Sequence, residues 1–143
     1  MEANGSNMYI LIDTSVLVSY LVDDDPNHHL GIEFMSSIKE DVIVILPPLC
    51  VFEISVTLSK LGYEVINIED KIFGLINTFR MIICQLNDLQ FVKNVDLLQN
   101  NNKVGTHDFY LLQTAMQFNI PVYTFDKKFA EHAKGIYDNI ILL

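Results

Sequence analysis

The chain has 143 residues, half of them hydrophobic, and a formal net charge of −9. This length suits a single domain with a substantial core, and the apolar content argues against disorder. The negative charge excludes a protein that coats nucleic acid by general electrostatic attraction, because neutralising phosphates requires many lysines and arginines. Its two cysteines, Cys50 and Cys84, are too few for a disulfide framework, so we expect buried free thiols.

The beginning of the chain does not resemble a secretory signal, because no basic region precedes an apolar run. We expect residues 1–7 to be a flexible lead and residues 8–143 to form one domain. The longest candidate membrane segment, Met8 to Val22, is short and contains an aspartate, which favours a buried core segment. We therefore expect a cytoplasmic protein that does not enter a membrane.

Short apolar runs typical of buried parallel strands alternate along the chain with stretches of helical periodicity. In chain order, the sequence predicts a strand at Met8–Ile12, helices at Val16–Val22 and Leu30–Ile38, a strand at Val42–Leu46, helices at Leu49–Leu61 and Ile68–Phe79, a strand at Met81–Leu86, helices at Asp88–Leu98 and Thr106–Asn119, a strand at Pro121–Phe125, a helix at Lys127–Lys134 and a strand at Ile140–Leu143. Gly62 suits the end of the third helix, and residues 99–105 read as a loop. This alternation predicts an α/β fold with a central, largely parallel sheet of about five strands and helices on both faces.

Four acidic residues stand where a predicted strand ends or early in a predicted helix: Asp13, Glu53, Asp108 and Asp126. Ligands in open α/β sheets gather at the carboxyl ends of the strands, so these acids could meet at one place. Two negative charges about 4 Å apart repel by roughly 4 kcal/mol at an effective dielectric near 20, and a divalent cation would remove that penalty. Carboxylate oxygens suit Mg²⁺ or Mn²⁺, which can activate a water molecule for phosphodiester hydrolysis.

The alternative for each acid is a helix cap or a surface charge. Asp13 and Asp126 directly follow strands, and Asp108 lies in the first turn after Thr106. Glu53 fits this alternative less well, since it lies in an apolar stretch where a lone carboxylate would be costly without a partner.

Three other features support only weaker interpretations. The pair His28-His29 follows three aspartates, yet adjacent helical side chains point in different directions, which favours a solvated helix start over a metal site. The same divergence argues against a role for His107 in orienting a water molecule or a phosphate. A phosphotransfer domain with an aspartyl nucleophile would need a second acid at Ser15.

The motifs around the first two acids resemble those of the PIN-domain family of metal-dependent nucleases, which includes the VapC-like toxins. The segment Tyr9–Leu17 is similar to the family's first motif, with Asp13 as its first metal-binding carboxylate and Ser15 as a small polar support. Phe52-Glu53-Ile54 resembles the family's central glutamate after a turn that contains proline.

The later motifs extend this resemblance over nearly the whole chain. The segment His107–Ala115 resembles the helix that carries the family's third acid, Asp108, and Tyr123–Phe129 resembles its final motif, with Thr124 as support and Asp126 as the fourth acid. Two features depart from the family pattern: a histidine precedes the third acid, and Arg80 is the only arginine.

The resemblance implies an endoribonuclease that uses Mg²⁺ or Mn²⁺, held by Asp13, Glu53, Asp108 and Asp126. It also implies a homodimer that cleaves RNA and is inhibited by an antitoxin protein as part of a toxin–antitoxin pair. Lys127-Lys128 could contact a phosphate or simply begin a solvated helix. The competing hypothesis is a non-catalytic PIN-like domain that keeps the acids but binds a protein or RNA partner without cutting it.

Overall fold

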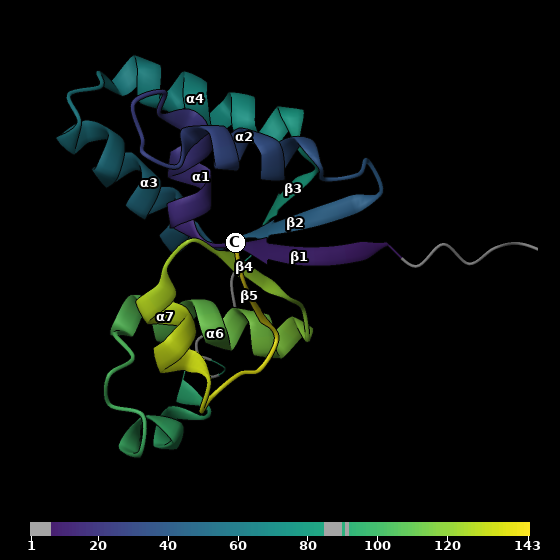
Figure 1. The fold of residues 1–143 in the computed structure, drawn as a ribbon, viewed down its shortest axis with the longest axis vertical. Helices are drawn as coiled ribbons and strands as arrows, with labels where there is room; N and C mark the ends of the chain where they lie inside the picture. The colour runs from purple at the N-terminus through teal and green to yellow at the C-terminus, as the bar shows by residue number, and fades with distance from the viewer. Residues whose placement is uncertain (1–6, 85–89, 91) are drawn as a thin grey trace, which may run out of the picture.

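Five parallel strands form one sheet in the computed structural model, which describes residues 7–84, 90 and 92–143 (Figure 1). The strands are β1 (Met8–Ile12), β2 (Val42–Leu46), β3 (Met81–Ile83), β4 (Val122–Thr124) and β5 (Ile140–Leu142). The helices of these described residues are α1 (Thr14–Leu21), α2 (His28–Ser36), α3 (Pro48–Lys60), α4 (Val65–Thr78), α6 (Thr106–Phe118) and α7 (Lys127–Ala133), with a short 3₁₀ helix, η1 (Val95–Gln99).

The strand order β3-β2-β1-β4-β5 places the first strand at the centre of the sheet. The chain builds β2 and β3 on one side of β1 and returns to build β4 and β5 on the other side. The carboxyl ends of β1 and β4 lie side by side, because Ile12 pairs with Tyr123. This junction is the switch point at which α/β sheets bind ligands.

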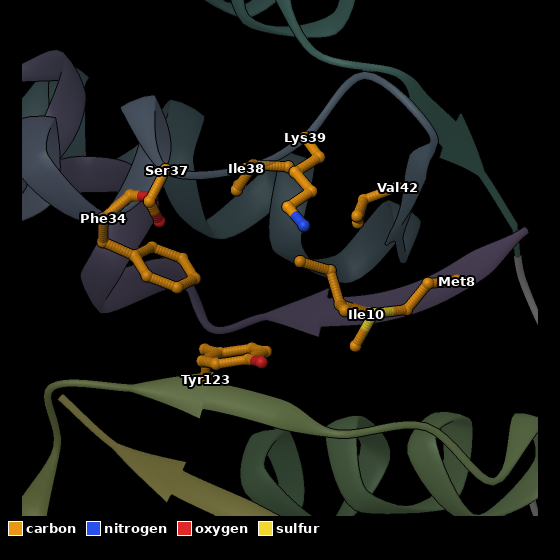
Figure 2. A pocket seen from close by; sticks show the side chains of 8 residues that line it. All are labelled: Met8, Ile10, Phe34, Ser37, Ile38, Lys39, Val42 and Tyr123. Atoms are coloured by element: carbon orange, nitrogen blue, oxygen red, sulfur yellow. The ribbon is translucent and has the colours of Figure 1, made fainter.

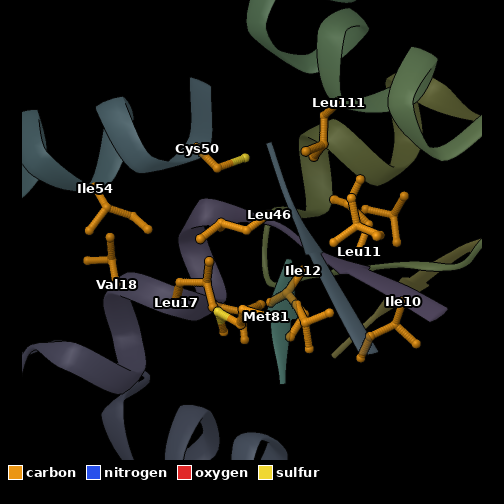
Figure 3. Close-up of a cluster of buried hydrophobic side chains, with 14 of the residues drawn as sticks. Ile10, Leu11, Ile12, Leu17, Val18, Leu46, Cys50, Ile54, Met81 and Leu111 are labelled. Carbon is orange, nitrogen blue, oxygen red and sulfur yellow. The ribbon is translucent and has the colours of Figure 1, made fainter. Parts of the chain in front are cut away.

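Helices cover both faces of the sheet. Figure 1 shows α1, α2, α3 and α4 on one side and α6 and α7 on the other. Successive strand residues point to opposite faces, and both Leu11 and Ile12 of β1 are fully buried. Figure 3 shows part of this core, where Val18 of α1 points toward Ile54 of α3. Because helices cover both faces of the sheet, its central strand β1 has to be apolar on both faces.

The third helix ends in a defined motif that fixes its length. Gly62 adopts a positive φ of 92°, a conformation that glycine reaches without a side-chain penalty. Its N–H donates to the Ser59 carbonyl at 3.0 Å, and the Tyr63 N–H donates to the Leu58 carbonyl at 3.1 Å. These two bonds form a Schellman motif, so the glycine predicted to end this helix does so.

The predicted fold class is confirmed, and the differences lie at element boundaries. Helix α4 begins at Val65 rather than at Ile68. The predicted strand Met81–Leu86 is a strand as far as Ile83, and its last two residues lie outside the described part of the chain.

The prediction of an α-helix over Asp88–Leu98 is wrong in its second half. Residues 88, 89 and 91 lie outside the described part, and Gln90 and Val92 are helical, but Val95–Gln99 is a 3₁₀ helix. Asn94 precedes it with a φ of 63°, a left-handed conformation that an α-helix does not contain. Of the predicted flexible lead, residues 1–6 also lie outside the described part.

Within the described ranges, no helix is both long and apolar enough to cross a membrane.

Candidate functional site

The junction between β1 and α1 positions Asp13. Its backbone is extended at the N-cap of α1, but its side chain makes no capping hydrogen bond. Instead, Asp13 Oδ2 accepts hydrogen bonds from Thr124 Oγ1 at 2.7 Å and from Ser15 Oγ at 2.9 Å. The carboxylate is therefore held by one hydroxyl group from the end of β4 and one from the first turn of α1.

The end of β4 carries the fourth acid. The Asp126 N–H donates to Thr124 Oγ1 at 2.9 Å, and Asp126 Oδ1 accepts the Phe129 N–H at 3.0 Å, which caps α7. Ser15 Oγ also accepts the Phe125 N–H at 3.3 Å. The segment after β4 is thus fastened to the segment after β1.

Glu53 lies in the second turn of α3 and receives one donor on each carboxylate oxygen. Thr14 Oγ1 donates to Glu53 Oε2 at 2.7 Å, and His107 Nδ1 lies 2.6 Å from Glu53 Oε1. Three helices from distant parts of the sequence, α1, α3 and α6, therefore meet at this carboxylate.

Asp108 lies in the first turn of α6 and is partly buried. The pKa of its carboxyl group is raised to about 6, mainly by desolvation and in addition by the negative charges of Asp13, Asp126 and Glu53, while His107 opposes the shift. The charges of the other three predicted acids thus all act on Asp108. A carboxyl group whose pKa is raised by burial together with nearby like charges is characteristic of functional sites.

Burial also affects two neighbouring groups. Desolvation raises the pKa of Asp13, and the charge of Glu53 adds to this, whereas the hydrogen bonds from Thr124 and Ser15 lower it. Burial raises the pKa of the Cys50 thiol to about 12, so this cysteine is neither a thiolate nucleophile nor a thiolate ligand at neutral pH.

A small hollow of about 10 Å³ lies between these groups, enough space for about one water molecule. Three of the four acids line it, together with hydrophobic and aromatic neighbours; the full lining is Asp13, Leu49, Cys50, Glu53, His107, Asp108, Tyr110 and Leu111. Asp126 is exposed and stands outside this lining, although its charge acts on Asp108.

The chemistry of these donors fits a hard divalent cation. Carboxylate oxygens are the ligands of Mg²⁺ and Mn²⁺, and a positive ion would relieve the repulsion that raises the pKa of Asp108. As the side chains stand, no three His, Cys, Asp or Glu groups within residues 7–84, 90 and 92–143 converge on a common ion position. Asp13, Glu53 and Asp108, which line the small hollow, are the residues that could hold such an ion.

A larger hollow of about 220 Å³ lies at the opposite end of the strands. Figure 2 shows its lining, which includes Met8 and Val42 at the starts of β1 and β2 and Phe34 against the ring of Tyr123. Apart from Ser37 and Lys39 the lining is apolar or aromatic. It contains no acid, so the predicted chemistry belongs to the smaller hollow.

The capping alternative holds fully for Asp126, which caps α7. Asp13 occupies the N-cap position of α1 without a capping hydrogen bond, and Asp108 lies in the first turn of α6, whose N-cap is Gly105. The weaker metal interpretation of the histidine pair has no geometric support: His28 Nδ1 contacts the Ser19 carbonyl at 2.7 Å and its Nε2 lies 3.6 Å from Asp23.

Sequence reasoning did not identify the two side chains that hold Glu53. Thr14 carries no signal of its own in the sequence, and the hypothesis for His107 concerns only a water molecule or a phosphate. The available signal was positional: Thr14 follows Asp13, and His107 precedes Asp108, so each lies one residue from an acid that was predicted.

Comparison with known proteins agrees with this fold. The PIN domain family model matches residues 10–135. A search of curated proteins gives no match. The fold resembles that of the toxin VapC20 of Mycobacterium tuberculosis, with a TM-score of 0.68, 17% identity and coverage of 85% of this chain and 93% of that one.

Two further solved structures share the fold. One is VapBC2 of Rickettsia felis, bound to a DNA fragment from its promoter, with a TM-score of 0.67, 15% identity and coverage of 95% and 98% of the two chains. The other is FitAcB of Neisseria gonorrhoeae, with a TM-score of 0.61, 21% identity and coverage of 87% and 93%. Because the family model spans most of the sequence and the fold agrees with it, this chain belongs to the PIN-domain family.

Proposed function

We propose that this protein is an endoribonuclease that depends on Mg²⁺ or Mn²⁺ and hydrolyses RNA phosphodiester bonds. The observation that carries the proposal is the convergence of acids from distant parts of the sequence. Asp13, Glu53 and Asp108 line one hollow, and the pKa of Asp108 rises to about 6 in their company. A cluster of carboxylates that repel one another is costly unless a cation neutralises it.

Each acid has a distinct place in this proposal. Asp13, Glu53 and Asp108 would hold the ion, and Asp126 would complete the site or hold a second ion. When bound, such an ion lowers the pKa of a water molecule and stabilises the charge that develops on the phosphate. Ser15 and Thr124 keep the Asp13 carboxylate in place through hydroxyl donors.

The proposed substrate is RNA, and its contacts must be local because the chain carries a net charge of −9. Lys127 and Lys128 are exposed directly after Asp126, which makes them candidates for contact with a phosphate next to the scissile bond. Structural similarity adds support, since VapC20 is described as a toxin that cleaves the sarcin-ricin loop. An RNA substrate would place the protein in the cytoplasm.

We also infer an antitoxin partner and a homodimer. Support for the antitoxin comes from the similar structures, which include a toxin–antitoxin complex from Klebsiella pneumoniae. The exposed apolar side chains of α3 and α4, among them Phe52, Ile66 and Phe73, supply surface that a partner protein could cover.

The experiment that tests the proposal is cleavage of labelled RNAs and single-stranded DNAs with Mg²⁺, Mn²⁺ or a chelator. Wild-type protein should cut RNA only when metal is present. Asp13→Asn should reduce the rate by about two orders of magnitude or more while the circular dichroism spectrum stays unchanged. Asp24→Asn is the matched control, because Asp24 is exposed in the turn between α1 and α2, and it should cut like the wild type.

The result that would overturn the proposal is equal cleavage by wild type and Asp13→Asn. Absence of cleavage in every condition, with Mn²⁺ binding retained, would instead favour the non-catalytic interaction domain. Mn²⁺ binding is therefore measured on the same samples as cleavage.

A further inference from the structure

His107 makes a contact that packing does not explain. Its side chain is 62% exposed, yet its Nδ1 lies 2.6 Å from Glu53 Oε1. A contact made by a side chain this exposed contributes little to folding stability, since the side chain loses freedom and water screens the interaction. The contact therefore has no evident role in building the core.

Glu53, the partner of His107, also accepts a hydrogen bond from a residue of α1. Thr14 Oγ1 donates to Glu53 Oε2 at 2.7 Å, so each oxygen of Glu53 has one donor. Because an ionised carboxylate only accepts hydrogen bonds, the imidazole must carry a hydrogen on Nδ1. The two donors contact different oxygen atoms of the Glu53 carboxylate and so hold its plane in one orientation.

This arrangement leaves Glu53 able to bind something else. A carboxylate has about four acceptor sites, so two donors leave roughly half of its capacity unused. Glu53 lines the small hollow together with Asp13, His107 and Asp108. A carboxylate with a fixed plane and unused acceptor sites at a hollow is prepared for a cation.

His107 also joins two layers of the fold. It neighbours Asp108 at the start of α6, whereas Glu53 belongs to α3, and these helices lie on opposite sides of the sheet (Figure 1). The contact therefore sets the position of Glu53 relative to Asp108. Two ligands from different layers need such a link if they are to share one ion.

We propose that His107 is a positioning residue, which orients Glu53 for the metal site without touching the metal or the RNA. This inference rests on the proposed function and adds to it a residue that departs from the family pattern. Groups that hydrogen-bond to a metal ligand typically change metal affinity by 10–100-fold when they are removed. The same range is expected for His107.

The test is Mn²⁺ affinity measured by isothermal titration calorimetry at one fixed pH. His107→Ala should bind Mn²⁺ about 10–100-fold more weakly than the wild type and should melt at nearly the same temperature. His107→Asn should recover most of the affinity, because its amide nitrogen can donate from nearly the position of Nδ1. His29→Ala is the matched control: His29 is exposed on α2, which contributes no residue to the acid cluster, and its loss should leave the affinity unchanged.

Two results would overturn the proposal, and they are distinguishable from failure of the proposed function. Wild-type affinity in His107→Ala overturns the role of His107 and leaves the metal site standing. A wild-type protein that binds no Mn²⁺ overturns the proposed function, and the imidazole ¹⁵N resonances then decide the inference. A hydrogen-bonded Nδ1–H in the wild type that changes in Glu53→Gln supports the contact, and its absence overturns it.

Discussion

The buried hydroxyl of Thr124 donates to Asp13 Oδ2 at 2.7 Å and accepts the backbone N–H of Asp126 at 2.9 Å. A hydroxyl has one hydrogen to give, and here the carboxylate receives it. Thr124 is fully buried, so neither bond is exchanged with water. One side chain thereby fixes the ends of two neighbouring strands and the first acid of the cluster.

Replacing Thr124 by valine should therefore cost more than the loss of one hydrogen bond. Valine keeps the shape but leaves a carboxylate oxygen and a backbone N–H without this partner. We expect the free energy of unfolding to fall by about 1–3 kcal/mol, measured by urea denaturation without metal. Mn²⁺ binding should weaken in the same protein.

Thr114→Val is the matched control for this substitution. Thr114 is equally buried, but its hydroxyl only donates to the Tyr110 carbonyl at 3.1 Å within the same helix. We expect a loss below about 1 kcal/mol and unchanged Mn²⁺ affinity. Similar losses from both threonines would contradict the special role of Thr124.

Asp126 should show separable effects on stability and function. Its Oδ1 caps α7 through the Phe129 N–H, and an asparagine oxygen can make the same bond. We expect Asp126→Ala to lose about 1 kcal/mol of stability and Asp126→Asn to lose little. Both should reduce cleavage if the charge takes part, so an active Asp126→Asn would leave this acid only its capping role.

The pKa of Asp108 predicts a pH-dependent stability. The folded-state value of about 6 exceeds the ordinary 3.8, so between these values the folded protein holds a proton that the unfolded chain has lost. Stability contributed by this group therefore falls as pH rises through this interval, and the penalty is complete above about pH 6. Asp108→Asn should remove the penalty and stabilise the metal-free protein near neutral pH by about 1 kcal/mol, after allowance for solvent screening.

The measurement is urea unfolding of wild type and Asp108→Asn in chelator at about pH 4 and about pH 7.5. The variant's advantage should be present at the higher pH and nearly absent at the lower one. An advantage of equal size at both values would mean that ionisation of Asp108 is not its source.

The two neighbours of Glu53 in α3 should contribute unequally to the free energy of unfolding, because one is buried and the other is exposed. Ile54 is fully buried beside Glu53, and Phe52 on its other side in the sequence is 64% exposed. Ile54→Ala should lower the free energy of unfolding by about 2–5 kcal/mol, and Phe52→Ala should change it by about 0.5 kcal/mol or less. Thermal and urea denaturation of the two proteins would check this, and a large loss in Phe52→Ala would indicate packing against a second copy.

Much of the fold was predictable because its strands are short and apolar on both faces. The run Val42–Leu46 has the same bounds in the sequence prediction and in the structure, and all five of its residues are buried. Hydrophobic periodicity predicts such elements well. It predicts poorly the 3₁₀ helix Val95–Gln99, because a left-handed Asn94 interrupts a pattern that otherwise reads as helical.

The site was predictable to the level of which acids approach one another, but not of how they are held. Asp13, Glu53 and Asp108 stood out because strand ends and helix starts gather at one edge of a parallel sheet. The pairing of His107 with Glu53 depends on how α3 and α6 are placed relative to each other, and the two residues are 54 positions apart in the sequence. A local sequence pattern does not tell how these two helices are placed relative to each other.

The strand order has a consequence for how the site comes into being during synthesis. Asp13 and Glu53 belong to the first part of the chain, and Asp108 and Asp126 belong to its last third. Strand β4 can add to β1 only after α6 has been made. A nascent chain that still lacks its last third therefore carries only half of the acid cluster. The edge of β1 that pairs with β4 stays unpaired until then, and the site forms late, when β4 adds to it.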